Sequence, residues 1–523
     1  METENRPTPP RRADELSLIA GKVYFVGSGP GDPGLLTLRA AELLRAADVV
    51  ILDSQVSAEV IARIGSHARI LDPAKKKSGK KRELTPEDIE QLIVDEGRKG
   101  KIVVRLKCGD PFVFSGGGEE AETLRKAGVP FEIVPGVTTA IAAPAYAGIP
   151  VTHSLGGSTV VLVNSKDPGF DSISWSALGS LGGTLIFLGG TAAVTTIASR
   201  LQEAGGMDAS TPAAVVSHGT TRRQRTVSGT IGTIAERSLE IDPAAQSLLV
   251  VGEVVRLQES IGWFESKPLF GRTIVVTRAR AQSSGLVKLL ENEGASVVQF
   301  PMIEIRPPEE WASLDAVLDR VSSYEWIVFS SSNGVDAFFE RLGHHGKDLR
   351  VLASCRIAAV GEATATSLHN RGIIPDLVPE KFQAAALIPH FPEDLTGVQI
   401  AIVRALSGKD DLLMELRHRG ARVDLGVAYQ TRPSRGLRDQ LGSMLGSGRI
   451  DAITFTSAST VDNFFEQLTD DERKNVISNI RLASIGPVTS EALRSHGVRP
   501  AIEAPEATIH ALKDALVERF SRD

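Results

Sequence analysis

The sequence predicts an α/β protein that is built from several domains. Apolar runs alternate with helical patterns along most of the chain, glycine-rich turns follow the apolar runs, and segments beyond Gly271 repeat one another. The chain has 523 residues, which is too long for one hydrophobic core. We therefore expect about three or four domains, at ~100–200 residues each.

The composition is that of an ordinary soluble globular protein, with 42% hydrophobic and 23% charged residues. A net charge of −6 gives no basic field, so nucleic acid is not an expected partner. Residues 1–17 are polar and proline-rich and predict a disordered tail rather than a signal peptide, and no run reaches the ~20 apolar residues of a membrane span. The two cysteines, Cys108 and Cys355, form neither a disulfide framework nor a metal site. A cytoplasmic protein without bound metal is expected.

The first domain opens with a glycine-rich turn at residues 27–34. An apolar strand at 23–26 leads into this turn, a helix over 35–47 leaves it, and a second strand covers 48–53. Glycine lets the backbone approach a ligand closely. The turn fits the dinucleotide pattern G-x-G-x-x-G, with Asp53 about 20 residues further on.

Other residues of this turn argue against a dinucleotide. Pro30 and Pro33 lack N–H donors, and Asp32 places a carboxylate where a pyrophosphate would lie. We therefore expect a ligand without phosphate. A plain tight turn and a dinucleotide site are the alternatives.

A helix at 57–64, a basic segment at 75–82 and a second helix follow. Thr85 is the expected N-cap of the second helix, which runs to about Glu96. Pro86 at its first position and the acids after it favour this start.

Two further strands of this domain also end in glycine-containing turns. A strand at 101–107 leads into residues 108–112, and a strand at 131–134 leads into residues 135–140, which precede a helix of small residues. Ligands of open α/β sheets bind at the carboxyl ends of the strands. The three turns therefore predict one ligand-binding crevice.

The next region predicts a second α/β subdomain. It contains extended segments at 158–163, 184–188 and 213–216, a hairpin near 224–230, and a last strand within 247–255. A linker with two aromatic residues follows.

The last part of the chain contains an internal repeat. A strand at 272–278 starts it, and a strand with a hydroxyl-rich turn at 326–335 recurs at 451–461. Residues 357–364 recur likewise at 482–489. The repeat predicts two similar α/β lobes that face one another, with helix N-termini suited to carboxylates.

The first part resembles the uroporphyrinogen-III C-methyltransferases of the tetrapyrrole methylase class. Six motifs follow the order of that family: residues 27–33, 49–53, 105–112, 135–138, 148–153 and 252–255. The last part is similar to uroporphyrinogen-III synthase, through Thr277 and Arg278 at a strand end and the turns 331–335 and 485–487. The fused order agrees, because the synthase product would be the methyltransferase substrate.

These resemblances imply a two-subdomain tetrapyrrole methylase followed by a bilobal α/β synthase module. The implied methyltransferase covers residues 21–258, with subdomains of about 21–135 and 136–258, and a linker covers 259–268. The implied synthase covers 269–520, with one lobe of about 269–302 and 434–520 and another of about 303–433.

The methyltransferase resemblance implies binding of S-adenosylmethionine and two methylations of uroporphyrinogen III to precorrin-2, for siroheme or cobalamin. The implied cofactor contacts are Pro30, Cys108, Gly109, Asp110, Val113, Thr138, Thr139 and Gly219. Asp53 would accept a proton and Lys77 would donate one. The choice among the lysines of 75–81 is open, with Lys76 the nearest alternative and a solvated basic loop the plain interpretation.

The synthase resemblance implies that hydroxymethylbilane is closed to uroporphyrinogen III with inversion of the last ring. The implied substrate contacts are Thr277, Arg278, Ser331, Asn333, Tyr429, Thr456, Ser457 and Thr489. Each can equally be a cap or turn residue.

The chain departs from the methyltransferase pattern in four places. Cys108 stands where the family has a glycine, Ser115-Gly116 where it has Gly-Arg, Ser154 where it has an arginine and Gly189 where it has a methionine. A tetrapyrrole-binding or cofactor-binding regulatory protein without turnover is therefore the rival hypothesis, and a nucleotide-dependent oxidoreductase is a more remote one. The resemblance allows a homodimer through the methyltransferase half. The sequence leaves channelling between the halves open.

Overall fold

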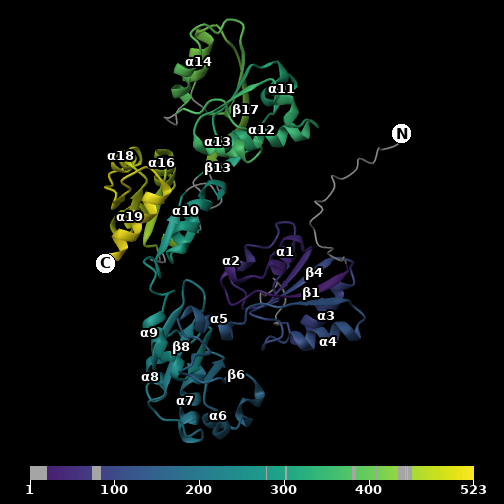
Figure 1. The fold of residues 1–523 in the computed structure, drawn as a ribbon, viewed down its shortest axis with the longest axis vertical. Coiled ribbons are helices and arrows are strands. Elements are labelled where there is room, and N and C mark those ends of the chain that lie inside the picture. The colour runs from purple at the N-terminus through teal and green to yellow at the C-terminus, as the bar shows by residue number, and fades with distance from the viewer. Residues whose placement is uncertain are drawn as a thin grey trace. The chain divides into compact units, whose positions relative to one another are not determined.

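The computed structural model describes residues 21–73, 84–277, 280–300, 303–379, 384–407, 410–433, 442, 444–445 and 450–522. The chain divides into two compact units, Met1–Gly271 with Glu293–Ala295 and Arg272–Asn292 with Ser296–Asp523 (Figure 1). Within the described ranges, each unit holds two sheets of five strands. None of the helices in these ranges is both long enough and apolar enough to cross a bilayer.

The first sheet of the first unit is parallel throughout, in the order β3-β2-β4-β1-β5. Its strands are β1 (Lys22–Gly27), β2 (Val49–Leu52), β3 (Arg69–Leu71), β4 (Ile102–Lys107) and β5 (Phe131–Val134). The helices of this subdomain are η1 (Pro33–Leu35), α1 (Leu38–Ala46), α2 (Ala58–Ile61), α3 (Pro86–Gly97) and α4 (Gly117–Lys126). Because β1 pairs with both β4 and β5, the three predicted glycine turns begin at one edge of one sheet, as expected.

Local signals placed α3 correctly. Thr85 accepts a hydrogen bond from the N–H of Asp88, and the Asp88 side chain accepts one from the N–H of Thr85. This reciprocal capping box satisfies two N–H groups that the first turn leaves unpaired.

The second sheet of this unit is mixed, in the order β6-β7-β10-β8-β9, and only its β6–β7 pair is parallel. Its strands are β6 (Val160–Asn164), β7 (Thr184–Leu188), β8 (Pro212–Ser217), β9 (Arg225–Thr230) and β10 (Ser247–Val251). Its helices are α5 (Thr139–Tyr146), η2 (Pro168–Ser172), α6 (Trp175–Leu181), η3 (Thr191–Ala193), α7 (Val194–Glu203), α8 (Ile234–Arg237), η4 (Ser238–Glu240), η5 (Glu253–Leu257) and α9 (Gln258–Ile261). The hairpin predicted near 224–230 is wrong in its bounds, because residues 225–230 form the single strand β9, which pairs antiparallel with β8. The small residues of α5, Ala140 and Ala143 among them, pack against β8 and β10.

One sheet of the second unit is parallel, in the order β12-β11-β18-β19-β20. Its strands are β11 (Thr273–Val276), β12 (Ser296–Gln299), β18 (Ala452–Phe455), β19 (Arg481–Ser484) and β20 (Ile502–Glu503). Its helices are α10 (Arg280–Asn292), α16 (Ala458–Glu466), α17 (Asp470–Asn479), α18 (Pro487–Ser495) and α19 (Ile509–Ser521).

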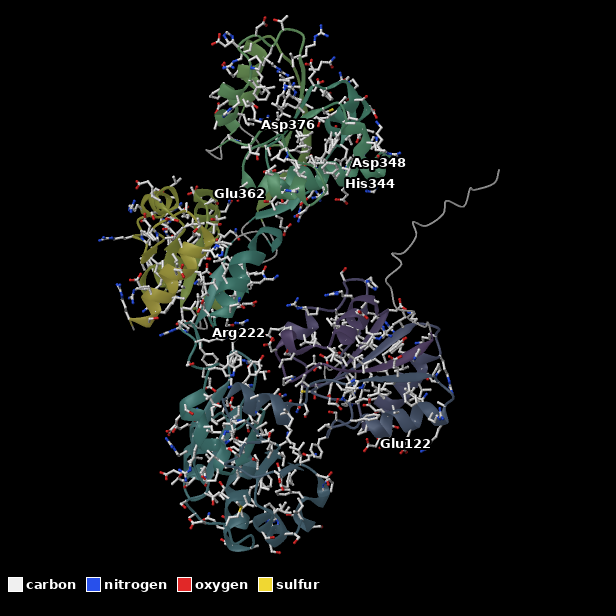
Figure 2. The ribbon with its side chains drawn as sticks, in the orientation of Figure 1. Glu122, Arg222, His344, Asp348, Glu362 and Asp376 are labelled. Carbon is white, nitrogen blue, oxygen red and sulfur yellow. The ribbon has the colours of Figure 1, made fainter. Side chains whose placement is uncertain are left out.

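The other sheet of the second unit has the order β13-β17-β16-β14-β15, with β13 antiparallel to β17. Its strands are β13 (Ile303–Arg306), β14 (Trp326–Phe329), β15 (Arg356–Ala359), β16 (Gln399–Ala405) and β17 (Arg422–Pro433). Its helices are α11 (Ala312–Asp319), η6 (Val321–Ser323), α12 (Ser332–His344), η7 (Leu349–Leu352), α13 (Glu362–His369), η8 (Ala384–His390) and α14 (Asp411–His418). Figure 2 labels His344 at the end of α12 and Glu362 at the start of α13.

The internal repeat is confirmed in backbone detail. Ser331 and Ser457 cap α12 and α16 with φ angles of −162° and −160°, and each side chain accepts a hydrogen bond from the N–H three residues later. The strands before them, β14 and β18, both lie inside their sheets. The two lobes therefore present the same hydroxyl-capped helix N-terminus at a strand end.

Candidate active sites

The three glycine turns of the first unit interlock through their backbones. Gly29 and Gly109 exchange hydrogen bonds, with N···O distances of 3.2 and 2.9 Å. A Cβ on Gly27 would lie 2.5 Å from the Cα of Gly136, and one on Gly136 would lie 2.2 Å from the Gly109 oxygen. The close approach of the turns therefore requires glycine at these positions.

Side chains of residues 108–115 hold the second turn in place. Asp110 accepts a hydrogen bond from the N–H of Gly136 at 3.0 Å through Oδ2, and one from the N–H of Phe112 at 2.8 Å through Oδ1. The hydroxyl of Ser115 lies within hydrogen-bonding distance of three backbone carbonyls, those of Cys108, Asp110 and Val113. Ser115, one of the departures from the family pattern, therefore organises the loop that carries four predicted cofactor contacts.

Asp53 lies at the end of β2, next to this loop. Its carboxylate accepts hydrogen bonds from the N–H of Ser54 at 2.8 Å and from the N–H of Cys108 at 3.4 Å. The structure thus places Asp53, the predicted proton acceptor, beside Cys108, a predicted cofactor contact. Two N–H groups orient the Asp53 carboxylate.

Cys108 carries a neutral thiol at this position. Burial, together with the negative charge of Asp53, raises the pKa of the Cys108 thiol to about 11. Thr139 also interacts with the thiol. Thr138, the other predicted threonine, caps α5 by accepting a hydrogen bond from the N–H of Ala140 at 3.4 Å.

The turn at 218–221 comes from the second subdomain and contacts the opening loop. His218 and Thr220 have positive φ angles of 46° and 65°, which non-glycine residues rarely adopt. The N–H of Asp32 donates to the Thr220 hydroxyl at 3.2 Å. A Cβ on Gly219 would lie 2.3 Å from the Cβ of Ala143 in α5. The predicted cofactor contact Gly219 therefore sits in a tightly packed turn opposite the opening loop.

Tyr146 completes this contact, although the sequence analysis did not predict it. Its hydroxyl donates to Asp32 Oδ2 at 2.8 Å, while Asp32 Oδ1 accepts from the N–H of Gly34 at 2.7 Å. Burial and the neighbouring Asp32 raise the pKa of Tyr146, so the hydroxyl keeps its proton and acts as a donor. A lone tyrosine in a helix of small residues was the only sequence signal.

A buried ion cluster lies next to the strand end that carries Asp53, and the sequence did not predict it. Glu120 Oε1 lies 2.8 Å from both Arg105 Nη2 and Lys107 Nζ. Arg105 also donates to the carbonyl of Leu52 at 2.8 Å, one residue before Asp53. Burial and the nearby Arg105 lower the pKa of Lys107, although Glu120 opposes this shift. The cluster therefore fixes the strand end that carries Asp53.

Four predicted positions of this unit remain, and the structure describes three of them. Pro30 is buried in the opening turn, and Lys77 lies outside the described residues. Gly189 has a φ of +148°, and a Cβ there would lie 1.9 Å from the Ser165 hydroxyl. A methionine could not occupy that position without a change of the local structure. Ser154 is exposed.

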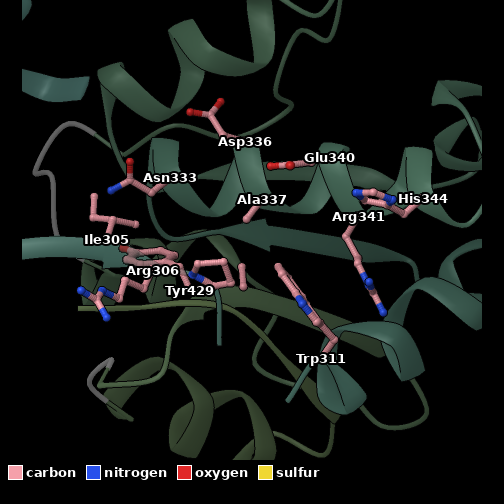
Figure 3. A pocket seen from close by; sticks show the side chains of 12 residues that line it. Ile305, Arg306, Trp311, Asn333, Asp336, Ala337, Glu340, Arg341, His344 and Tyr429 are labelled. Carbon is pink, nitrogen blue, oxygen red and sulfur yellow. The ribbon is translucent and has the colours of Figure 1, made fainter. Parts of the chain in front are cut away.

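The second unit contains a pocket of about 280 Å³ beside α12. Figure 3 shows side chains of α12 on one side and those of β13 and β17 on the other. Its lining includes two predicted contacts, Asn333 and Tyr429, and the Tyr429 hydroxyl lies 2.9 Å from that of Ser331. The pocket thus joins three of the predicted substrate contacts.

The pocket also carries charged and aromatic groups that the sequence analysis did not predict. Arg341 pairs with Asp315 at 2.7 Å and lies over the ring of Trp311, 5.0 Å from its centroid. Arg306 lies at the edge of the sheet beside Tyr429, as Figure 3 shows. Two guanidinium groups therefore line this pocket, together with carboxylates of α12.

The other predicted residues of this unit serve the sheet and helix ends. Thr277 is fully buried, and its hydroxyl donates to the carbonyl of Thr454 at 2.8 Å. Thr489 is 4% exposed in α18. Thr456 and the capping residue Ser457 are half-buried, and Arg278 lies outside the described residues.

Both units match known families. Residues 22–235 match the family described as Tetrapyrrole (Corrin/Porphyrin) Methylases, and residues 284–514 match Uroporphyrinogen-III synthase HemD. The Porphyrin biosynthesis protein HemD of Ruminiclostridium josui is 37% identical over 501 residues, which are 95% of this chain and 98% of the relative. The chain therefore belongs to the proteins in which a tetrapyrrole methylase of the uroporphyrinogen-III C-methyltransferase type is fused to a uroporphyrinogen-III synthase.

Two other similar proteins carry the methyltransferase name. A Uroporphyrinogen-III C-methyltransferase of Bacillus subtilis (strain 168) is 34% identical over 357 residues, 68% of this chain and 72% of the relative. A crystal structure of the Uroporphyrin-III C-methyl transferase from Thermus thermophilus, complexed with S-adenyl homocysteine, is 35% identical, with a TM-score of 0.39. It covers 45% of this chain and 99% of that one.

Proposed function

We propose that this chain is a bifunctional enzyme of tetrapyrrole biosynthesis. Its second unit cyclises hydroxymethylbilane to uroporphyrinogen III, and its first unit methylates that product twice to precorrin-2, for siroheme or cobalamin. The observation that carries the proposal is the placement of Asp53 beside three interlocked glycine turns at one edge of a parallel sheet. Membership of both families supports the pairing of activities.

The groups of the three glycine turns fit S-adenosylmethionine, which supplies an electrophilic methyl group when it is bound. The turns offer backbone carbonyls, the hydroxyls of Thr138 and Thr139 and the neutral thiol of Cys108, while Pro30 and Pro33 donate no N–H. Such a set suits a cationic ligand without phosphate better than a pyrophosphate, which needs N–H donors. The cofactor contacts proposed from the resemblance therefore agree with the chemistry of this site.

Asp53 is proposed as the base that removes the ring proton after methyl transfer. A base must reach the proton in a fixed orientation, and the N–H groups of Ser54 and Cys108 orient this carboxylate. Methyl transfer otherwise needs mainly the alignment of donor and acceptor. Lys77 as proton donor stays a proposal from the resemblance.

The pocket beside α12 is proposed as part of the bilane site of the second unit. Ser331, Asn333 and Tyr429 supply hydroxyl and amide groups. Arg306 and Arg341 pair with Glu304 and Asp315 in the structure, and we propose that they turn N–H donors to substrate carboxylates. The enzyme has to fold the bilane and exclude other ring closures. Thr456 and Ser457 offer the equivalent hydroxyls of the other lobe. The buried Thr277 would act through the carbonyl of Thr454 that it holds, and Thr489 is buried in α18.

A homodimer through the methyltransferase unit is also proposed. Several large apolar side chains of this unit are exposed, and pairing with another chain would remove such apolar surface from water. They include Leu38, Phe112, Phe114, Ile141 and Leu155. Light scattering of the full chain tests the dimer, and a monomeric mass at micromolar concentration contradicts it. The cytoplasmic location stays a prediction.

A methyl-transfer assay with uroporphyrinogen III tests the first activity. Bound S-adenosylmethionine with no mono- or dimethylated product would support the rival hypothesis of a binding protein without turnover. Calorimetric titration with NAD and with S-adenosylmethionine addresses the oxidoreductase hypothesis, which requires that NAD binds and S-adenosylmethionine does not.

A further inference from the structure

The segment after α9, which leads toward the second unit, is packed onto the methyltransferase unit. Trp263 donates from Nε1 to the carbonyl of Ala145 at 3.1 Å, and Phe264 is 7% exposed. The carboxylate of Glu265 accepts hydrogen bonds from the Gln224 amide at 2.8 Å and from both the N–H and the hydroxyl of Thr226. These three donor groups thus belong to the second subdomain.

Gln224 connects Glu265 to the cofactor crevice. Its side chain is 3% exposed, and its oxygen accepts a hydrogen bond from the N–H of Thr220 at 2.7 Å. The Thr220 hydroxyl in turn accepts from the N–H of Asp32 in the opening loop at 3.2 Å. Three successive hydrogen bonds therefore join the segment at 262–270 to the loop that begins the cofactor site.

The turn that this chain of bonds holds is strained. His218 and Thr220 both have positive φ angles, 46° and 65°, on either side of Gly219. Such conformations cost free energy and persist only where the surrounding structure fixes them. The Gln224 side chain supplies this restraint, because it binds the Thr220 N–H in the strained turn itself.

A second path from the same segment also ends at Asp32. The ring of Tyr146 lies 5.0 Å from that of Trp263 and 4.8 Å from that of Phe264, measured between centroids. Its hydroxyl donates to Asp32 Oδ2 at 2.8 Å. The residues after α9 therefore support both sides of the contact between the opening loop and the turn at 218–221.

We propose that Glu265 is a positioning residue of the cofactor site. It acts through Gln224 and Thr220 and fixes the turn that carries Gly219 against the opening loop. The segment that leads toward the synthase thus supports the cofactor site of the methyltransferase unit without forming part of it. This proposal rests on the proposed function, in which the crevice binds S-adenosylmethionine.

Affinity for S-adenosylhomocysteine, measured by calorimetry on the full chain, tests the proposal with four variants. Glu265→Ala removes the acceptor of the Gln224 amide and weakens binding about tenfold, the size of effect that a buried charged hydrogen bond has. Gln224→Glu sets two carboxylates against each other and weakens binding at least as much. The exchange Gln224→Glu with Glu265→Gln restores the pairing and returns the affinity to within about threefold of the parent. Glu259→Ala, an exposed glutamate of α9, leaves the affinity unchanged.

Steady-state kinetics separate positioning from a purely structural role. The KM for S-adenosylmethionine rises in Glu265→Ala and in Gln224→Glu, whereas the KM for uroporphyrinogen III and the turnover of hydroxymethylbilane stay at parental values. Parental affinity in Glu265→Ala, or an exchange variant that binds as poorly as Gln224→Glu, overturns the proposal. If Glu265→Ala does not fold, the exchange variant decides. An unaltered chain that binds no S-adenosylhomocysteine overturns the proposed function itself and this proposal with it.

Discussion

The carboxylate of Asp53 accepts a hydrogen bond from the backbone N–H of Cys108 at 3.4 Å. The two residues end neighbouring strands, β2 and β4, whose pairing brings them together. In the proposed function the base and the cofactor loop are therefore held in one geometry by the sheet itself.

Replacing Asp53 by Asn tests the role of this carboxylate. The amide keeps the shape, and its single oxygen can still accept from the N–H of Ser54, but it gives up the longer bond from the N–H of Cys108 and cannot take a proton. Methyl transfer should slow about a hundredfold or more, the usual contribution of a positioned base. The affinity for S-adenosylmethionine should stay within about twofold, because the cofactor loop is unchanged. Stopped assays of methylated product and calorimetry measure the two quantities. A large loss of cofactor affinity would show that Asp53 binds the cofactor instead.

The ion cluster beneath Asp53 predicts a difference between two glutamates of α4. Glu120→Ala leaves Arg105 and Lys107 buried without their carboxylate, which should cost about 3–5 kcal/mol of unfolding free energy. Glu122, labelled in Figure 2, pairs at 3.8 Å with Lys126 on the surface, so Glu122→Ala should cost less than about 1 kcal/mol. Urea denaturation, monitored by the hydrogen exchange of amides in β4 and α4, measures the unfolding free energies of both variants. Equal costs for the two variants would contradict the account of the cluster.

Cys108 should resist alkylation at neutral pH. With a pKa near 11, only about one thiol in a thousand is ionised at pH 8, and the thiolate is the reactive form. The thiolate population grows as the pH increases toward this raised pKa. The rate of labelling by iodoacetamide should therefore rise with pH over the same range. Mass spectrometry of the labelled peptide gives the rate. Rapid and complete labelling at pH 7 would show that the thiol is activated.

Tyr429 and Tyr324 provide a matched pair in the second unit. Tyr429→Phe removes the hydroxyl that lies against Ser331 in the pocket and should slow bilane closure about tenfold or more. Tyr324 donates to Asp424 at 2.7 Å and does not line the pocket. Tyr324→Phe should therefore lower stability by about 1 kcal/mol and leave turnover within about twofold. Methylation of supplied uroporphyrinogen III should be unaffected in both. A Tyr429 variant with parental closure rates would remove the pocket from the proposed site.

Short-range patterns predicted much of the fold. The capping box at Thr85 and the paired caps Ser331 and Ser457 depend on neighbours within a few residues. The helix predicted over 57–64 is shorter in the structure, where α2 ends at Ile61. After it, the N–H groups of Arg63 and Ile64 donate to carbonyls three residues earlier, which is a turn rather than a continued helix.

The contacts that hold the candidate sites depend on tertiary structure. Glu265 lies in a segment that the sequence predicts to be a linker, and its partner Gln224 is 41 residues earlier. The positive φ of Thr220 has no local sequence signal, because a threonine there is stable only with its distant partners. Thr277 ends a strand, where periodicity alone cannot tell a hydroxyl that faces a ligand from one that bonds the next strand.

Incubation of the full chain with hydroxymethylbilane, with and without S-adenosylmethionine, tests the central claim most directly. The account predicts uroporphyrinogen III alone without the cofactor and the dimethylated product, precorrin-2, with it. Identification of both products by mass spectrometry and isomer-resolving chromatography distinguishes enzymatic closure from the spontaneous isomer I. Isomer I alone in the first reaction, or unmethylated uroporphyrinogen III in the second, would contradict the bifunctional assignment.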